Sequence, residues 1–294
     1  MTELTHAFEA AMPVTPTRLF QALTDPAELA GWFAEHADID PAAGRFRFWG
    51  RSSYSTPTAA EADQVLSRFE PGKGLTFSWT VQGQPSQVDW RIEGDPKTAG
   101  DAIWKVRHHF PVAPAIGRAK SLITDLWSFH TGALKTHLIG QPVDLPDFTD
   151  PAPRVRQSIF VAAPRERVFQ ALIDPEILNR WIASAARVEP RVGGEMSYGW
   201  EYKVDGRPVT GGPTRILELV PNEKLVTDWP DWRLEPGAPV TTVSWTLTDE
   251  AGGTRVTLTH GTFERPADIG DYPYGWQDFL VALARLFAAG GEAA

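Results

Sequence analysis

The sequence predicts an α+β protein made of two copies of one domain, each with a short strand, two short helices, an antiparallel meander and a long C-terminal helix. Three observations predict it: an internal repeat, strand-like alternation in the middle of each copy, and one long amphipathic helix at the end of each copy. The chain has 294 residues, which matches two domains at roughly 100–200 residues each.

The repeat is clearest where residues 20–26 read FQALTDP and residues 169–175 read FQALIDP. Beyond these segments the same order of matched residues continues through both copies: Trp32/Trp181, Pro71/Pro221, Trp79/Trp229, Trp90/Trp245, His108/His260 and Trp127/Trp276. Chance similarity does not hold register over so many residues. We therefore assign one domain to residues 1–140, a proline-rich linker to 141–153 and a second domain to 154–294.

Each copy opens with a short strand, predicted over residues 4–10 and 156–162, and continues with a helix that has proline near its start. The pairs Asp25-Pro26 and Asp174-Pro175 then end this helix and begin a second short one. We expect that second helix to end near the matched tryptophans Trp32 and Trp181.

The middle of the second copy alternates with a period of two from Met196 to Val204, and Asp205-Gly206 supplies a hairpin turn. Further strands are predicted at 215–220, 225–229, 241–248 and 254–259, with turn residues between them. These features are typical of an antiparallel meander.

The last element of each copy carries an apolar stripe at helical spacing. In the second copy the stripe contains Trp276, Phe279, Leu280, Leu283, Leu286 and Phe287. In the first copy it contains Ile123, Trp127, His130, Leu134 and Leu138.

This combination resembles the START-like, or SRPBCC, superfamily of helix-grip domains, and within it the activator of heat-shock-protein ATPase homologue-like family. The resemblance rests on residues 168–175 with Trp181, on residues 216–229 around the turn 221–224, on residues 254–260, and on Gly275-Trp276. It covers nearly the whole second copy and the first copy more loosely. The first copy departs from it with a longer polar segment, 51–63, and has no glycine before Trp127.

The resemblance implies that in each copy a curved antiparallel sheet wraps around the long C-terminal helix, with a cavity between them that holds an apolar molecule. Strand parity predicts which side chains face this cavity. We expect the ligand-binding residues in the second copy to be Met196, Tyr198, Trp200, Tyr202, Leu217, Trp229, Trp245, Leu258, His260, Trp276, Phe279 and Leu283. For the polar members Tyr198, Tyr202 and His260 two interpretations stay open. They are core residues with satisfied hydrogen bonds, or they contact and protonate a ligand.

Three functions are compatible with these features. The first is binding of an apolar or aromatic small molecule for sequestration, sensing or transport, mainly by the second domain. The second, implied by relatives of the polyketide cyclase or aromatase type, is catalysis with His260 as base and Tyr198 or Tyr202 as acid or oxyanion donor. The third, implied by the family name, is regulation of a chaperone ATPase. We favour binding over catalysis.

Composition narrows the partners. A net charge of −9 disfavours nucleic acid and acidic membrane surfaces, and the absence of cysteine removes thiolate sites and disulfides. Six of the seven histidines lie in the first copy but lack metal-binding spacing, so we predict neither a metal nor another cofactor. With no signal peptide or membrane span visible we expect a cytoplasmic protein.

The duplication and the loop after Trp229-Pro230 lead to two more expectations. The two copies are expected to be able to pair as an intramolecular pseudo-dimer, because a duplicated surface is self-complementary about a two-fold axis. Trp232 lies either in a loop that closes over a ligand at the pocket mouth or in a turn packed on a neighbour.

Overall fold

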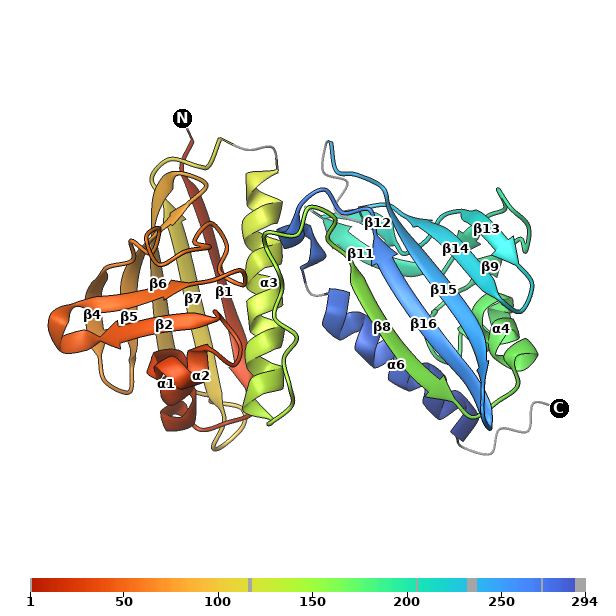
Figure 1. The fold of residues 1–294 in the computed structure, drawn as a ribbon, viewed down its shortest axis with the longest axis horizontal. Coiled ribbons are helices and arrows are strands. Elements are labelled where there is room, and N and C mark those ends of the chain that lie inside the picture. Colours follow the sequence, from red (N-terminus) through yellow and green to blue (C-terminus); the bar gives the residue numbers. More distant parts are fainter. Residues whose placement is uncertain (1, 116–117, 205, 232–236, 271, 289–294) are drawn as a thin grey trace. The chain divides into compact units, whose positions relative to one another are not determined.

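The computed structural model describes residues 2–115, 118–204, 206–231, 237–270 and 272–288 (Figure 1). The chain divides into two compact units, Met1–Pro151 with Arg265–Gly270 and Ala152–Glu264 with Asp271–Ala294. The break near residue 151 lies within the segment that we assigned to the linker. Residues 265–270, which the sequence assigned to the second domain, cluster with the first unit.

The first unit contains a five-stranded antiparallel sheet and one long helix. The sheet has the order β1-β7-β6-β5-β4, and a separate hairpin pairs β2 with β3. The elements are β1 (Leu4–Met12), α1 (Pro16–Thr24), α2 (Pro26–Leu29), β2 (His36–Asp40), η1 (Pro41–Ala43), β3 (Arg45–Trp49), β4 (Leu66–Glu70), β5 (Gly74–Val81), β6 (Gln84–Gly94), β7 (Ala102–Phe110) and α3 (Ala119–Leu138).

The second unit repeats this plan. Its sheet runs β13-β14-β15-β16-β8, which is the first sheet's order read from the other edge, and α6 lies across one face of it (Figure 1). The elements are β8 (Val155–Val161), α4 (Arg165–Ile173), α5 (Pro175–Leu178), β9 (Arg187–Val188), β10 (Met196–Ser197), β11 (Trp200–Val204), β12 (Arg207–Gly211), β13 (Ile216–Val220), β14 (Lys224–Trp229), β15 (Thr241–Glu250), β16 (Gly253–Gly261) and α6 (Tyr272–Ala288). Both units are helix-grip domains, as the sequence predicts.

The Asp-Pro motif has the same structural role in both units. Oδ1 of Asp25 accepts hydrogen bonds from the backbone N–H groups of Ala27 (2.8 Å) and Glu28 (3.2 Å), and Asp174 caps α5 in the same way. The indole N–H of Trp32 donates to the carbonyl of Ala22 at 3.0 Å, which ties α2 back onto α1. The repeated sequence thus encodes a repeated helical corner.

The segment 51–63 differs from the sequence expectation. Matched residues keep one offset across it, since 196 − 46 and 221 − 71 both equal 150, so the segment is not longer than its counterpart in the second copy. There the counterpart forms the hairpin β11–β12, with Val204 opposite Arg207, although Asp205 of the predicted turn lies outside the described residues. In the first unit the segment folds inward instead, and Ser52, Ser53 and Thr56 are buried.

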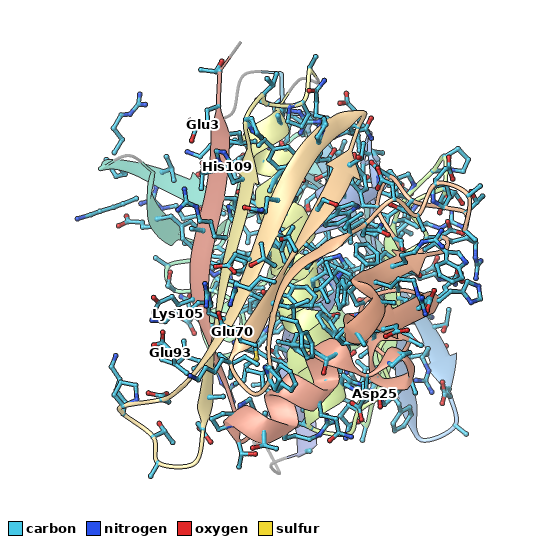
Figure 2. The ribbon with its side chains drawn as sticks, turned by 90° about the vertical axis from the view of Figure 1, so that its left-hand side faces the viewer. Glu3, Asp25, Glu70, Glu93, Lys105 and His109 are labelled. Carbon is cyan, nitrogen blue, oxygen red and sulfur yellow. The ribbon has the colours of Figure 1, made fainter. Side chains whose placement is uncertain are left out.

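Charged residues cover the outer face of the first sheet. Lys105 Nζ lies 2.8 Å from a carboxylate oxygen of Glu93 and 3.4 Å from one of Glu9, and Arg68 lies 2.8 Å from Glu70. Figure 2 shows Lys105, Glu93 and Glu70 along this face. Such exposed pairs add little stability, typically about 0–1 kcal/mol each, so the fold depends on the opposite, aromatic face.

A short helix, η2 (Pro266–Ile269), lies within the segment that joins the first unit. Arg118, just before α3, lies 3.2 Å from the Asp268 carboxylate, and both side chains are almost fully buried. Arg265 contacts the same carboxylate at 2.6 Å. Among the described residues, no helix combines the length and apolar character that crossing a bilayer needs.

Candidate functional site

The second unit contains a pocket of about 260 Å³ between α6, the hairpin β11–β12 and the end of β14. Its lining residues are Trp200, Tyr202, Gly211, Gly212, Trp229, Tyr272, Gly275, Trp276 and Phe279. All of them are aromatic or glycine. The pocket therefore offers flat apolar walls and space where side chains are missing.

The pocket walls are held in place by ring contacts and one indole hydrogen bond. Trp200 stacks on Phe279 with ring centroids 5.4 Å apart and planes 16° apart, and Trp229 contacts Trp276 at 4.9 Å. The N–H of Trp200 donates to the carbonyl of Ile182 at 2.8 Å. These contacts favour a pocket that is largely formed before any ligand enters.

A glycine turn aims Trp200 at the pocket. Gly199 has φ +69°, and a Cβ on it would lie 2.7 Å from atoms of Ala185. Only glycine meets both demands without strain. The strand predicted from Met196 to Val204 is interrupted at this point, because β10 ends at Ser197 and β11 begins at Trp200. The side-chain alternation itself is kept, since Met196 and Tyr198 are buried and Trp200 and Tyr202 line the pocket.

His260 lies in a chain of hydrogen bonds that runs from Trp276 to the carbonyl of Trp229. Trp276 Nε1–H donates to His260 Nδ1 at 3.1 Å, which assigns the imidazole proton to Nε2. Nε2 then donates to Thr241 Oγ1 at 2.8 Å, and that hydroxyl donates to the carbonyl of Trp229 at 2.9 Å. Burial lowers the pKa of His260 to about 3, so the ring is neutral at about pH 7. The two hydrogen bonds occupy both ring nitrogens.

The first unit contains the same chain of hydrogen bonds. Trp127 Nε1–H donates to His108 Nδ1 at 3.1 Å, His108 Nε2 lies 2.7 Å from Ser86 Oγ, and Ser86 Oγ donates to the carbonyl of Trp79. Burial, followed by the charges of neighbouring histidines, lowers the pKa of His108 to about 3. Because the same hydrogen bonds occur in both units, they are best explained as structural contacts that hold the long helix of each unit, α3 or α6, against its sheet. The structure thus favours the core interpretation of His260.

The two tyrosine candidates differ in position. Tyr198 is fully buried against Trp200 and Trp229, is not one of the lining residues, and burial raises the pKa of its hydroxyl. Tyr202 lines the pocket and is 42% exposed. His260 and Tyr198 thus lie behind the walls, and the lining residues include no acid–base pair.

Five of the twelve expected ligand-binding residues line the pocket: Trp200, Tyr202, Trp229, Trp276 and Phe279. Six others are buried in the core outside the lining: Met196, Tyr198, Trp245, Leu258, His260 and Leu283. Leu217 was expected to face inward but is 43% exposed. A register shift between Ile216 and Glu218 reverses strand parity there and buries Ile216 instead.

Sequence reasoning missed four lining residues, Gly211, Gly212, Tyr272 and Gly275. Tyr272, Gly275, Trp276 and Phe279 follow the spacing i, i+3, i+4, i+7, so the α6 stripe begins one turn earlier than we assigned it. Periodicity gave no indication that the glycines line a pocket, because it follows side chains and these residues have none.

Two other features were considered in the sequence, a metal site among the histidines and Trp232. Within the described parts of the chain, no group of three or more histidine, aspartate or glutamate side chains is arranged to hold a metal ion. Trp232, for which a place at the pocket mouth was one expectation, lies outside the described residues.

Comparisons with known proteins agree with the duplicated fold. The sequence profile of the family described as "Activator of Hsp90 ATPase homolog 1-like protein" matches residues 13–102 and 162–288. No curated protein matches the chain.

Similar solved structures include the Aha1 dimer from Colwellia psychrerythraea, with 20% identity over 47% of this chain and 97% of that one and a TM-score of 0.38. CalU16 from Micromonospora echinospora has 26% identity over 47% and 73%, with a TM-score of 0.36. DynU16, from the dynemicin biosynthetic locus, has 17% identity over 96% and 98%, with a TM-score of 0.38.

The two profile matches cover most of the chain and fall one in each half, where the structure shows one helix-grip domain each. The chain therefore belongs to the Activator of Hsp90 ATPase homolog 1-like family, and carries that family's domain twice.

Proposed function

We propose that the second unit binds a small, neutral aromatic molecule in the pocket between α6 and the hairpin β11–β12, for sequestration, sensing or transport. The observation that carries this proposal is the wall composition, six aromatic side chains and three glycines. No charged side chain of the described residues lines the pocket. A charged ligand group would lose its hydration without gaining a partner, which disfavours ions.

The pocket volume supports a ligand of limited size. At about 260 Å³ it lies just below the range of roughly 300–1,000 Å³ typical of small-molecule sites. The stacked pair Trp200 and Phe279 presents flat surfaces, which favour planar rings over flexible chains. One or two fused rings fit these limits best.

Binding is better supported than catalysis. A general base needs a free lone pair within hydrogen-bond reach of the reacting group, and both nitrogens of His260 are engaged in hydrogen bonds, with Thr241 and with Trp276. Tyr198 lies outside the lining, and a raised hydroxyl pKa makes it a poorer proton donor.

The test uses the tryptophans of the pocket as reporters. Titration with neutral bicyclic aromatics should quench intrinsic fluorescence and raise the melting temperature. At a ligand concentration of roughly 100 Kd the stabilisation should approach about 2.7 kcal/mol. A panel of such compounds, with long-chain fatty acids and charged aromatics for comparison, that changes neither signal would refute the proposal.

The family description provides a second candidate, stimulation of a chaperone ATPase. This activity depends on a protein-binding surface, whereas ligand binding depends on the pocket. An ATPase assay with Hsp90 would separate the two. Stimulation that persists when the pocket is filled by Gly275→Leu would assign that activity to the surface.

A further inference from the structure

Trp229 differs from the other tryptophans of the pocket because its indole N–H has no hydrogen-bond acceptor among the described residues. The N–H groups of Trp200 and Trp276 donate to the Ile182 carbonyl and to His260 Nδ1. Among the described residues, no acceptor takes a hydrogen bond from Trp229 Nε1, although the side chain is only 4% exposed. Trp229 Nε1 is not among the fully buried polar atoms that lack a partner, so this N–H keeps some exposure at a residue that lines the pocket. It is therefore available to an acceptor on a bound molecule.

The first unit shows which partner a tryptophan at this position takes. Trp79 is the counterpart of Trp229, because Trp79 pairs with Ser86 across β5–β6 and Trp229 pairs with Thr241 across β14–β15. The N–H of Trp79 donates to the hydroxyl oxygen of Thr56 at 3.3 Å. Thr56 is itself buried, and Gln64 Nε2 donates to the same oxygen at 3.4 Å.

Thr56 belongs to the segment that replaces the β11–β12 hairpin in the first unit. That segment thus delivers an oxygen acceptor to the indole, whereas in the second unit the hairpin forms one side of the pocket. The two indoles also differ in tilt. Trp79 lies parallel to His108, with planes 3° apart, and Trp229 lies at 61° to His260. The indole with an acceptor and the indole beside the pocket therefore adopt different orientations.

The first unit is also filled where the second is open. Leu126 takes the position of Gly275, since 275 − 126 and 276 − 127 both equal 149, and it is fully buried. The aromatic rings of Phe33, Phe48 and Trp79 contact one another at 4.9–6.3 Å. The first copy therefore fills with its own side chains the space that the pocket occupies in the second copy.

We propose that the ligand of the second unit is an aromatic molecule carrying a neutral oxygen acceptor, a ketone, quinone, ether or hydroxyl, that accepts a hydrogen bond from Trp229 Nε1–H. This inference rests on the proposed function and adds the chemical class of the ligand. The ligand oxygen takes the part that Thr56 Oγ1 plays for Trp79.

Two probes of similar size test the inference on the full chain: chromone, which has a ring carbonyl, and naphthalene, which has no acceptor. Calorimetry should show chromone binding about fivefold more tightly than naphthalene, the effect of one neutral hydrogen bond. In Trp229→Phe, which keeps a ring but removes the N–H, the ratio of the two affinities should fall to about one. The matched control Trp79→Phe should keep the wild-type ratio.

A second measurement needs no variant. In proton–nitrogen correlation spectra of the wild type, chromone should move the assigned Trp229 indole proton downfield, and naphthalene should not. Equal affinities for the two probes, or equal shifts, would overturn the inference and leave the pocket proposal standing. Binding of neither probe would overturn both.

Discussion

Filling the pocket from the helix side should weaken ligand binding without harming the fold. Gly275 lies in the first turns of α6, lines the pocket, and has no atom within 4 Å of the position a Cβ would take. Gly275→Leu adds four carbon atoms. At roughly 30 Å³ for each water-sized group, these occupy about 120 Å³, close to half of the 260 Å³ available.

The expected magnitudes follow from that volume. Forcing a bicyclic ligand into the remaining space costs about 1–3 kcal/mol, the usual cost of overpacking, which lowers affinity roughly 5- to 150-fold. Stability should rise, because replacing glycine inside a helix contributes up to about 1 kcal/mol, or roughly 2–4 °C in melting temperature. Leu126 at the matching position of the first unit shows that the fold accommodates leucine there.

Fluorescence titration and thermal melts of the wild type, Gly275→Leu and Gly275→Ala provide the assay. The alanine variant gains helix stability while adding only one methyl group, so it separates stability from filling. Wild-type affinity in Gly275→Leu, with a normal melt, would show that the ligand binds elsewhere.

Two further predictions concern the buried histidines. Thr241→Val removes the hydroxyl that lies between His260 and the Trp229 carbonyl. It should lower the free energy of unfolding, measured by urea titration, by about 1–3 kcal/mol. An unchanged urea midpoint would contradict the hydrogen-bond chain from Trp276 through His260. Burial lowers the pKa values of His108, His130 and His260 from 6.5 to about 3. Between these two pH values the unfolded chain binds more protons than the folded chain. The free energy of unfolding therefore has its full value above pH 6.5 and falls as the pH drops below it, by about 1.4 kcal/mol per pH unit for each histidine. His130→Phe, which copies Phe279 of the second unit, should reduce this slope by one histidine, and equal stability at about pH 7 and about pH 4.5 would refute the assignment.

The local motifs of the sequence were sufficient for the architecture. Asp25 and Asp174 cap the second helix of each copy, and the fold follows the order of matched tryptophans from Trp32 to Trp276. These predictions succeeded because caps, turns and apolar periods depend on residues close together in the chain.

The site was only partly predictable, because its outline depends on departures from regular structure. Leu217 faces out after a bulge, and Gly199 interrupts a strand whose side-chain alternation reads as continuous. The polar segment around Thr56 is partly buried, and the Thr56 hydroxyl finds its partners, Gln64 and Trp79, inside the unit. The hydropathy pattern does not predict these features, because each depends on contacts with residues from another part of the chain.

The buried pairing of Arg118 with Asp268 has a practical result for dissecting the protein. Cleavage after Pro151 would give an N-terminal fragment that retains the Arg118 guanidinium but has lost residues 265–270. Taking one member from a buried ion pair commonly costs about 3–5 kcal/mol. The two repeats are therefore interwoven in sequence, and isolating the first one intact requires a chain in which residues 265–270 are grafted back.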